Sequence, residues 1–326
     1  MADDLARAIL GAEPIFTSEE IAAAAGLSYD EIRRLWRALG FPDSAGSKAF
    51  VPADLDALQT VRAVIGTGVV DADTVVRLTR ALGSTMARLA DWQVSTIAEV
   101  LERRIEASEN DGPDAWATSG RAVAEALGPV FERLLVYAWR RHLAASASRA
   151  EALAADEEDL LRMVVTVGFA DLVAFTKLSN GLDDDGLADL VEEFETRCID
   201  VITEGGGRPI KTLGDAVLFV AETPELATDI AFAVVAEIGG DRDLPDVRVG
   251  LGTGQVISRL GDVYGPPVNL ASRLTAVARR NRVIIDRATA DGLSDRFETR
   301  AMAQRHLRGF GTVEPLTVRH RWSYNG

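Results

Sequence analysis

The most constraining feature of this chain is a change of pattern near residue 150. Before it, the sequence consists of amphipathic helical patterns rich in Ala, Leu and Arg. After residue 160, short apolar runs alternate with helical patterns, which predicts one sheet with helices packed against it. We therefore expect an all-helical domain over 1–148, a charged helical connector over 149–161 and an α+β domain over 162–326. The 326 residues are enough for two separate cores.

Two helix starts are well marked in the first half. Thr17 with Glu20 and Ser28 with Glu31 have the spacing of capping boxes, and Gly26 separates them. They predict two short helices joined by a tight turn.

The segment 15–58, which contains both helices, resembles a helix-turn-helix of the MerR type. Its second helix carries Arg33, Arg34 and Arg37, which could contact phosphates. The same arginines also suit the solvated face of a packed helical domain. Because the net charge of −15 repels nucleic acid over most of the surface, we do not expect a nucleic acid partner.

The remaining elements are predicted from periodicity and turn residues. In the first half, a loop over 108–114 precedes a helical stretch that we expect to break at Gly128-Pro129. In the second half, we expect strands at 163–169, 208–213, 216–221, 246–252, 255–260, 282–286 and 315–321, and helices at 184–204, 224–238, 266–280 and 287–294.

Bulk features point to a cytoplasmic protein. No apolar run reaches the length of a membrane span, and the N-terminus lacks a signal-peptide pattern, so we expect no membrane partner. The single cysteine, Cys198, excludes an intrachain disulfide and lies on the apolar side of a helical pattern. It is therefore predicted to be a buried core thiol.

Two isolated acids follow apolar strands in the second half. Asp171 ends the strand in VVTVGFADLVAF, and Asp215 lies in the hairpin turn Leu213-Gly214-Asp215. Two carboxylates at strand ends of one sheet could converge on Mg²⁺ or Mn²⁺, whereas three histidines do not favour a zinc site. Aspartate is also common as a turn or helix cap, and spacing alone leaves both interpretations open.

The stretch GDVYGPPVNLASRL predicts a helix that begins at Pro266-Pro267. Asn269 and Arg273 are four residues apart and share one face of it. That face could hold anionic oxygens or could be an ordinary solvated face, and these residues alone do not decide between the two.

Three stretches, FADLVAFT, IKTLGDAVLF and GDVYGPPVNLASRL, together resemble the class III nucleotidyl cyclases in order and separation, over roughly residues 160–322. The resemblance implies a ferredoxin-like α+β catalytic domain with packed helices. The first half is similar to the all-α regulatory domain that precedes this domain in some soluble actinobacterial members.

The resemblance assigns roles to six residues in three pairs. Asp171 and Asp215 match the two metal-binding aspartates. Lys211 and Asp262 match the pair that reads the purine. Asn269 and Arg273 match the catalytic pair that stabilises the transition state. Phe175, Thr176 and Arg308 are weaker matches for contacts to the phosphates. Phe310 stands where members often place a second basic residue.

The implied activity is that of an adenylate cyclase, which converts ATP to 3′,5′-cyclic AMP and pyrophosphate. Two metal ions, Mg²⁺ or Mn²⁺, are implied at each active site. The family architecture implies a homodimer in which each site takes Asp171 and Asp215 from one chain and the other four residues from its partner. The alternatives are a guanylate cyclase, or a catalytically idle nucleotide-sensing or DNA-binding regulator that uses segment 15–58.

Hydrogen-bond polarity favours ATP over GTP. Ionised Asp262 can only accept and Lys211 can only donate, which matches the N6 donor and N1 acceptor of adenine. Guanine presents the opposite pattern, and unpaired polar groups at a binding site are costly.

The helical half is expected to regulate catalysis. His142 lies between this half and the connector, so it is a candidate pH switch, although a plain surface histidine beside Arg140 and Arg141 is the favoured interpretation. A small apolar regulatory ligand among the helices is compatible with the pattern, but no residue specifies one.

Overall fold

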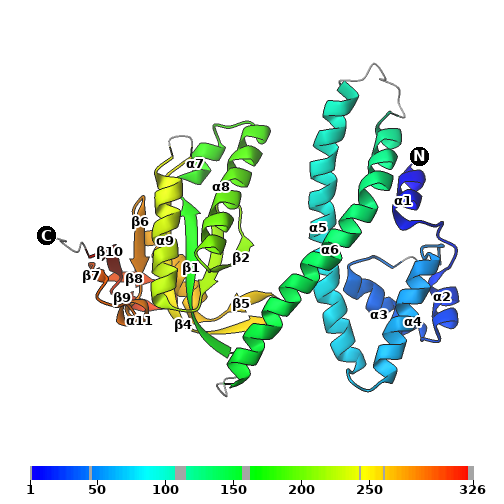
Figure 1. Cartoon of the computed structure of the whole chain (residues 1–326), viewed down its shortest axis with the longest axis horizontal. Coiled ribbons are helices and arrows are strands. Elements are labelled where there is room, and N and C mark those ends of the chain that lie inside the picture. The colour runs from blue at the N-terminus through cyan, green and yellow to red at the C-terminus, as the bar shows by residue number, and fades with distance from the viewer. Residues whose placement is uncertain are drawn as a thin grey trace. The chain divides into compact units, whose positions relative to one another are not determined.

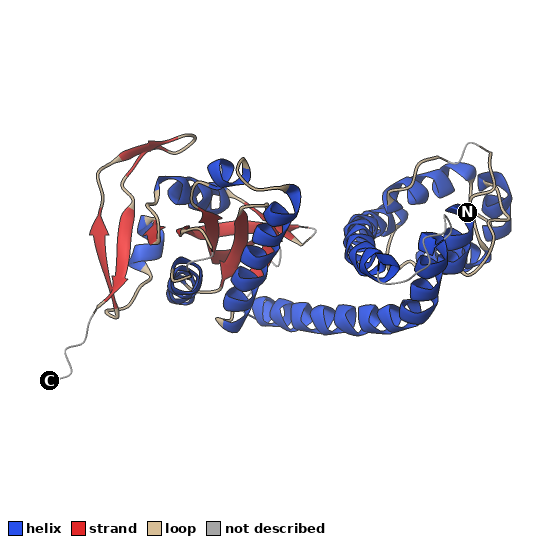
Figure 2. Cartoon of the chain, turned by 90° about the horizontal axis from the view of Figure 1, so that it is seen from above, coloured by secondary structure: helices blue, strands red, loops and turns tan. Residues whose placement is uncertain are grey.

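The structure, a computed structural model, describes residues 2–43, 46–106, 115–155, 162–241, 244–259 and 261–321. The chain divides into two compact units, Met1–Ser146 and Ala147–Gly326. The first is helical and the second contains a sheet with packed helices (Figure 1 and Figure 2). The predicted loop over 108–114 and residues 156–161 of the predicted connector lie outside the described residues.

The first unit is built from α1 (Ala2–Leu10), α2 (Ser18–Ala25), α3 (Tyr29–Leu39), α4 (Pro52–Gly66), α5 (Ala72–Glu106) and the first part of α6 (Ala115–Ala155). Both predicted capping boxes are confirmed. The Thr17 N–H donates to Glu20 Oε2 at 2.9 Å, and the Ser28 N–H donates to Glu31 Oε2 at 2.7 Å. Gly26 ends α2 with a φ of +66°, which a residue with a Cβ rarely adopts.

The arginines of α3 are paired with aspartates. Arg33 Nε lies 2.8 Å and Arg37 Nη2 3.6 Å from Asp43 Oδ2, and Arg34 Nη2 lies 2.5 Å from Asp73 Oδ1. Their charge is thus partly neutralised within the helical unit itself.

The predicted break at Gly128-Pro129 is wrong, because α6 continues through Pro129. Proline lacks the N–H of one helical hydrogen bond, but its φ near −65° is helical, so a long helix can absorb it.

The second unit contains a sheet of eight strands, which are β1 (Arg162–Leu172), β2 (Arg208–Thr212), β3 (Ala216–Ala221), β4 (Val247–Arg259), β5 (Asp262–Tyr264), β6 (Arg282–Ile285), β7 (Phe297–Ala301) and β10 (Leu316–His320). The order is β2-β3-β1-β4-β6-β10-β7, and β5 pairs with β4. Only the β4–β6 pairing is parallel among the described strands. A separate hairpin joins β8 (Arg305–Leu307) to β9 (Gly311–Val313).

Helices cover both faces of this sheet. They are α7 (Phe175–Ser179), α8 (Asp184–Glu204), α9 (Pro224–Gly239), α10 (Pro266–Val277) and α11 (Arg287–Asp291). Along β3, Val217 and Phe219 join the core beneath α8 and α9, whereas Leu218 and Val220 join the opposite core beneath α10. This alternation is the period of two that a strand imposes.

Several elements differ from the sequence prediction. The strands expected at 246–252 and 255–260 are one continuous strand, β4, and α7, β5, β7, β8 and β9 were not predicted. Strand β7 (sequence FETRA) lies at the sheet edge and, among the described strands, pairs with β10 alone, so its apolar alternation is weak.

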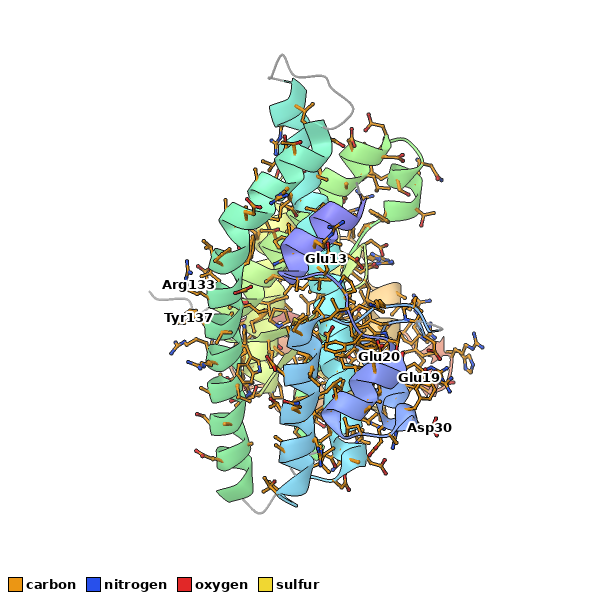
Figure 3. All side chains as sticks on the ribbon, turned by 90° about the vertical axis from the view of Figure 1, so that its right-hand side faces the viewer. Glu13, Glu19, Glu20, Asp30, Arg133 and Tyr137 are labelled. Atoms are coloured by element: carbon orange, nitrogen blue, oxygen red, sulfur yellow. The ribbon has the colours of Figure 1, made fainter. Side chains whose placement is uncertain are left out.

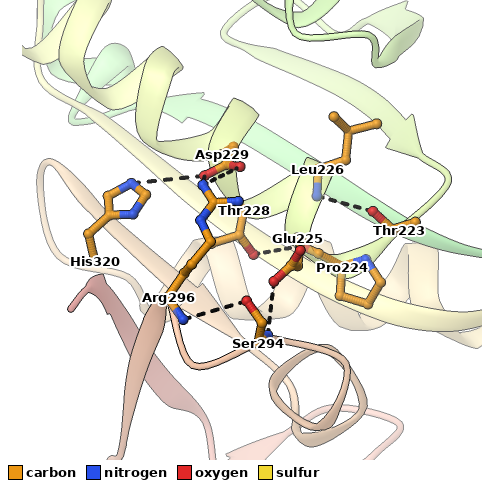
Figure 4. Close-up of polar contacts among 9 residues, drawn as sticks. All are labelled: Thr223, Pro224, Glu225, Leu226, Thr228, Asp229, Ser294, Arg296 and His320. Atoms are coloured by element: carbon orange, nitrogen blue, oxygen red, sulfur yellow. Dashed lines mark hydrogen bonds and ion pairs between the residues drawn. The ribbon is translucent and has the colours of Figure 1, made fainter. Parts of the chain in front are cut away.

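Long-range polar contacts hold the segment before β7 to α9 (Figure 4). The Ser294 N–H donates to Glu225 Oε1 at 3.0 Å, and Arg296 Nη2 lies 3.2 Å from Asp229 Oδ2. His320 Nε2 of β10 lies 3.9 Å from Asp229 Oδ1. Local sequence carries no signal for contacts of this kind.

Candidate active site

The two predicted metal-binding aspartates lie at the same end of neighbouring strands. Asp171 of β1 is opposite Ala216 of β3, and Asp215 immediately precedes that residue. The Leu172 N–H donates to the Asp215 carbonyl at 2.9 Å, which fixes the turn against β1. The register of β1 and β3 therefore brings the two acids together.

The turn that presents Asp215 is the predicted hairpin. The Leu213 N–H donates to the Ala216 carbonyl at 2.7 Å, and Gly214 has a φ of +73°, in the left-handed region that favours glycine. The Asp215 side chain is half-buried.

Arg248 is a site residue that sequence reasoning missed. It lies opposite Asp171 on β4, and its Nε and Nη2 are 2.6 Å and 2.5 Å from Asp171 Oδ2. Its Nη1 donates to the Ala276 carbonyl of α10 at 3.3 Å. A signal was available, since an arginine between the buried Val247 and Val249 of a central strand needs an anionic partner.

The electrostatics of Asp171 reflect these neighbours. Burial raises the pKa of Asp171, the hydrogen bond and charge of Arg248 oppose that rise, and the charge of Asp215 adds to it. The net direction is upward. An additional positive charge beside Asp171 would therefore stabilise its ionised carboxylate.

Lys211 of β2 and Asp262 of β5 form a direct ion pair, with Nζ 2.6 Å from Oδ2. Burial alone would raise the pKa of Asp262, but hydrogen bonds from Lys211 and from the Val263 N–H outweigh it, so the pKa is lowered. Both side chains remain partly exposed. The pair thus presents one cationic donor and one anionic acceptor side by side.

Asn269 and Arg273 lie one turn apart on α10, and both are exposed. Neither side chain bonds to any other residue that the structure describes. The helix approaches β4 closely because Gly250 has no side chain, and a Cβ there would clash with the backbone N and Oγ1 of Thr275. Thr275 Oγ1 also donates to the Phe169 carbonyl at 3.3 Å.

Strand alternation places these groups on one face of the sheet. Asp171 has the same parity along β1 as Val165 and Val167, which belong to the core beneath α10. Lys211 is opposite Leu218, which belongs to the same core. The ion-paired side chains and the exposed Asn and Arg of α10 therefore share the face opposite α8 and α9.

The weaker predictions have different surroundings. The Phe175 side chain packs against the core beneath α8 and α9. A contact of this residue with a phosphate would therefore have to come from its backbone N–H. Thr176 and Arg308 are exposed, and Phe310 packs against the small cluster beneath α10 that contains Leu307. His142 is exposed on α6.

Comparisons with known proteins agree with this architecture. Residues 162–319 match the adenylate and guanylate cyclase catalytic domain, and residues 4–143 match the adenylate cyclase regulatory domain. An adenylate cyclase of Streptomyces coelicolor is 37% identical over 96% of this chain and 88% of its own length. An adenylate cyclase of Streptomyces griseus is 38% identical over 96% and 87%. A pH-sensitive adenylate cyclase of Mycobacterium tuberculosis is 29% identical over 96% and 80%.

The chain belongs to the class III nucleotidyl cyclase family. It is an adenylate cyclase of the type that carries a helical regulatory domain ahead of its catalytic domain. Catalytic domains of this family generally use divalent metals and function as dimers. No helix among the described residues has the length and apolarity that crossing a bilayer requires.

Proposed function

We propose that this enzyme converts ATP to 3′,5′-cyclic AMP and pyrophosphate, with Mg²⁺ or Mn²⁺ ions held by Asp171 and Asp215. The observation that carries the proposal is the presence of two assembled pairs on one face of the sheet. Asp171 adjoins Asp215 at the strand ends, and Lys211 Nζ lies 2.6 Å from Asp262 Oδ2. A catalytically inactive member of the family would be expected to have lost some of these residues, whereas this chain keeps both pairs together with Asn269 and Arg273.

The two aspartates fit a divalent cation. Mg²⁺ is usually bound through one or two carboxylates plus substrate phosphates. The described part of the chain contains no group of three or more His, Cys, Asp or Glu that could hold a metal. The raised pKa of Asp171 indicates a carboxylate short of positive charge. When bound, the metal ions lower the pKa of the ribose 3′-hydroxyl and neutralise the leaving pyrophosphate.

The chain's own residues supply orientation and charge. Arg273 offsets the charge that develops on the α-phosphoryl oxygens, and Asn269 orients the ribose for in-line attack. Both side chains are exposed and without partners among the described residues, so they are available to a substrate. The backbone N–H groups at Phe175 and Thr176, and the Arg308 side chain, are our candidates for contacts to the triphosphate.

ATP is favoured over GTP by the polarity of the purine-reading pair. Asp262 accepts from the adenine N6 amino group, and Lys211 donates to N1. Because the pKa of Asp262 is lowered, its carboxylate stays ionised and remains an acceptor at neutral pH. Guanine would place an acceptor against this acceptor.

The first test measures cyclic AMP formed from ATP and Mn²⁺ by the purified chain. Asp171→Ala and Asp215→Ala should each abolish turnover while the fold is retained, because both residues lie at strand ends rather than in the core. A variant that keeps more than about a tenth of the wild-type kcat, equivalent to about 1.4 kcal/mol of barrier, would overturn the metal assignment.

We further propose a homodimer whose active sites lie between chains, with the aspartates from one chain facing the other four residues from its partner. The test mixes Asp171→Ala with Asn269→Ala under conditions that allow chain exchange. Half of the dimers become mixed, and each mixed dimer has one intact and one doubly damaged site. Activity should recover to roughly a quarter of the wild type by symmetry. No recovery despite demonstrated exchange would refute shared sites.

Regulation by the helical domain completes the proposal, with His142 as a pH-responsive group and a small apolar molecule as a further candidate signal. The pH sensitivity of the Mycobacterium tuberculosis relative motivates the pH test. A fragment from about residue 155 onward should differ from the full chain in activity. Equal activity of the two under all conditions would remove the regulatory assignment.

A further inference from the structure

A groove of about 800 Å³ opens on the surface of the second unit, away from the residues of the candidate active site. Its walls are α7, α8 and the segment that leads into β4 (Figure 1). Four leucines line it, and they are Leu178, Leu182, Leu190 and Leu244. Leu178 and Leu182 are each 38% exposed. Apolar side chains gathered at one exposed place are typical of a surface that binds a partner.

The α8 wall of the groove is one stripe of that helix. The α8 residues that line the groove recur at spacings of three and four, and they are Gly186, Asp189, Leu190, Glu192, Glu193, Thr196 and Arg197. A different stripe of α8, which contains Phe194, Cys198 and Ile202, is buried in the core. The groove therefore follows α8 for about three turns, or about 16 Å at 1.5 Å per residue.

The polar part of the lining is acidic. Arg197 is the cation among the lining residues, and its charge is already paired. Arg197 Nε lies 2.6 Å from Glu193 Oε1, and its Nη1 lies 2.5 Å from Asp241 Oδ2. By contrast, the exposed side chains of Asp189 and Glu192 bond to no other residue that the structure describes. The groove thus combines exposed leucines with uncompensated negative charge.

These properties exclude several occupants. The described part of the chain holds no group of three or more His, Cys, Asp or Glu that could bind a metal, so the acids here are not a cation site. Nucleic acids and anionic lipids carry the same sign of charge as the groove and are repelled by it. A second copy of this chain, with its net charge of −15, also presents like charge over most of its surface.

Segments of this chain outside the described residues do not match the groove either. Those longer than two residues have the sequences ASENDGPD at 107–114, DEEDLL at 156–161 and WSYNG at 322–326, and none contains Lys or Arg. The complementary charge must therefore come from another molecule.

We infer that this groove is a docking site for a basic amphipathic helix of a different protein. Such a helix lays its apolar face into an apolar groove, with anchors at i, i+3, i+4 and i+7. Its apolar side chains would contact the four leucines, and its Lys or Arg side chains would pair with Asp189 and Glu192. A length of about three turns suits this mode, whereas small ligands bind in sites that enclose most of their surface.

The position of the groove gives such a partner access to the catalytic unit. Leu178 belongs to α7, which begins at Phe175, four residues after Asp171 of β1. A docked helix would therefore contact the element that follows the strand of the candidate active site. Binding itself is defined by the groove and does not depend on cyclase activity.

The test uses a model peptide of leucine and lysine, roughly 14 residues long, with its leucines on one helical face. Fluorescence anisotropy of the labelled peptide with the full-length chain, at an ionic strength of about 0.15 M, gives the dissociation constant. Asp189→Lys should raise this constant at least about tenfold, because like charges across an interface are strongly unfavourable. Leu182→Ser should raise it roughly fivefold by removing an apolar contact.

Matched controls separate docking in the groove from attraction by net charge. Asp30→Lys makes the same change of charge at an exposed acid of the helical unit (Figure 3) and should leave the dissociation constant within about twofold. Val69→Ser removes an 84% exposed apolar side chain outside the groove and should likewise have little effect. A scrambled peptide of the same composition has no apolar face and should bind at least about tenfold more weakly.

Three results would overturn the inference. Equal binding of the ordered and scrambled peptides, or equal constants for Asp189→Lys and Asp30→Lys, would show attraction by net charge alone. Binding of spermine that Asp189→Lys abolishes, without binding of the peptide, would assign the groove to a small cation. A change in the oligomeric state of Asp189→Lys in sedimentation velocity, with peptide binding unchanged, would assign it to a second copy of the chain.

Discussion

Replacing Arg248 by methionine isolates the contribution of the cation that contacts Asp171 among the residues the structure describes. The guanidinium places two nitrogens within 2.6 Å of Asp171 Oδ2 and holds the Ala276 carbonyl at 3.3 Å. Methionine keeps much of the apolar stem but no charge. Burial and the neighbouring Asp215 both raise the pKa of Asp171, so loss of Arg248 leaves a carboxylate with only unfavourable surroundings.

The magnitude follows from the burial of the pair. The Arg248 and Asp171 side chains are 28% and 17% exposed. Breaking a fully buried pair costs about 3–5 kcal/mol and a surface pair about 0–1 kcal/mol, so we expect a loss of about 2 kcal/mol at pH 7. The loss should shrink as the pH falls through the raised pKa of Asp171, because the folded state then takes up a proton and removes the uncompensated charge.

The assay monitors urea unfolding by pulsed hydrogen exchange of peptides from β1 and β4. It reports on the catalytic unit alone, since a chain of two units need not unfold in two states. The matched control is Arg319→Met, which breaks an exposed 2.7 Å pair with Glu298 and should cost under about 0.5 kcal/mol. Asp171→Asn combined with Arg248→Met should recover most of the loss. Equal effects of Arg248→Met and Arg319→Met at pH 7, or a loss that does not change with pH, would refute the reasoning.

Three further outcomes are expected. Lys211→Glu combined with Asp262→Cys should strongly reduce ATP cyclisation and change the ATP-to-GTP ratio of kcat/KM; an unchanged ratio would show that these residues do not read the purine. His142→Ala should flatten the activity profile between about pH 5.5 and 8 if α6 transmits a pH signal, and an identical profile would dispose of that role. Burial raises the pKa of Cys198 to about 12, so a thiol reagent at pH 8 should modify it roughly a hundredfold faster in urea than in the native chain. Comparable native and unfolded rates would contradict a buried thiol.

Much of the local structure could be predicted because it depends on neighbours in sequence. The capping boxes at Thr17 and Ser28, the hairpin at Gly214 and the helix start at Pro266 each rest on backbone conformation and hydrogen bonds within a few residues. The motifs that carry the family resemblance lie on these same local elements. Residue type and spacing therefore sufficed to recognise the class of enzyme.

Other features depend on contacts that no local window contains. Arg248 and Asp171 are 77 residues apart and meet only because β1 and β4 pair in one register. Lys211 and Asp262 are 51 residues apart and belong to β2 and β5, which are not neighbours in the sheet. Strand β7 forms at the sheet edge although its own sequence has weak alternation.

The sequence by itself determined which chemical groups the chain carries and which short segments become helix, strand or turn. Tertiary structure decided which of those groups meet and which surfaces remain uncovered. Helix α6 makes the distinction clear, since its helical pattern is readable in the sequence and only the fold reveals that residues 129–149 are all exposed. The physical reason is that hydrogen bonds within a turn are set by local backbone geometry, whereas burial and ion pairing depend on strand register and on what packs against each face.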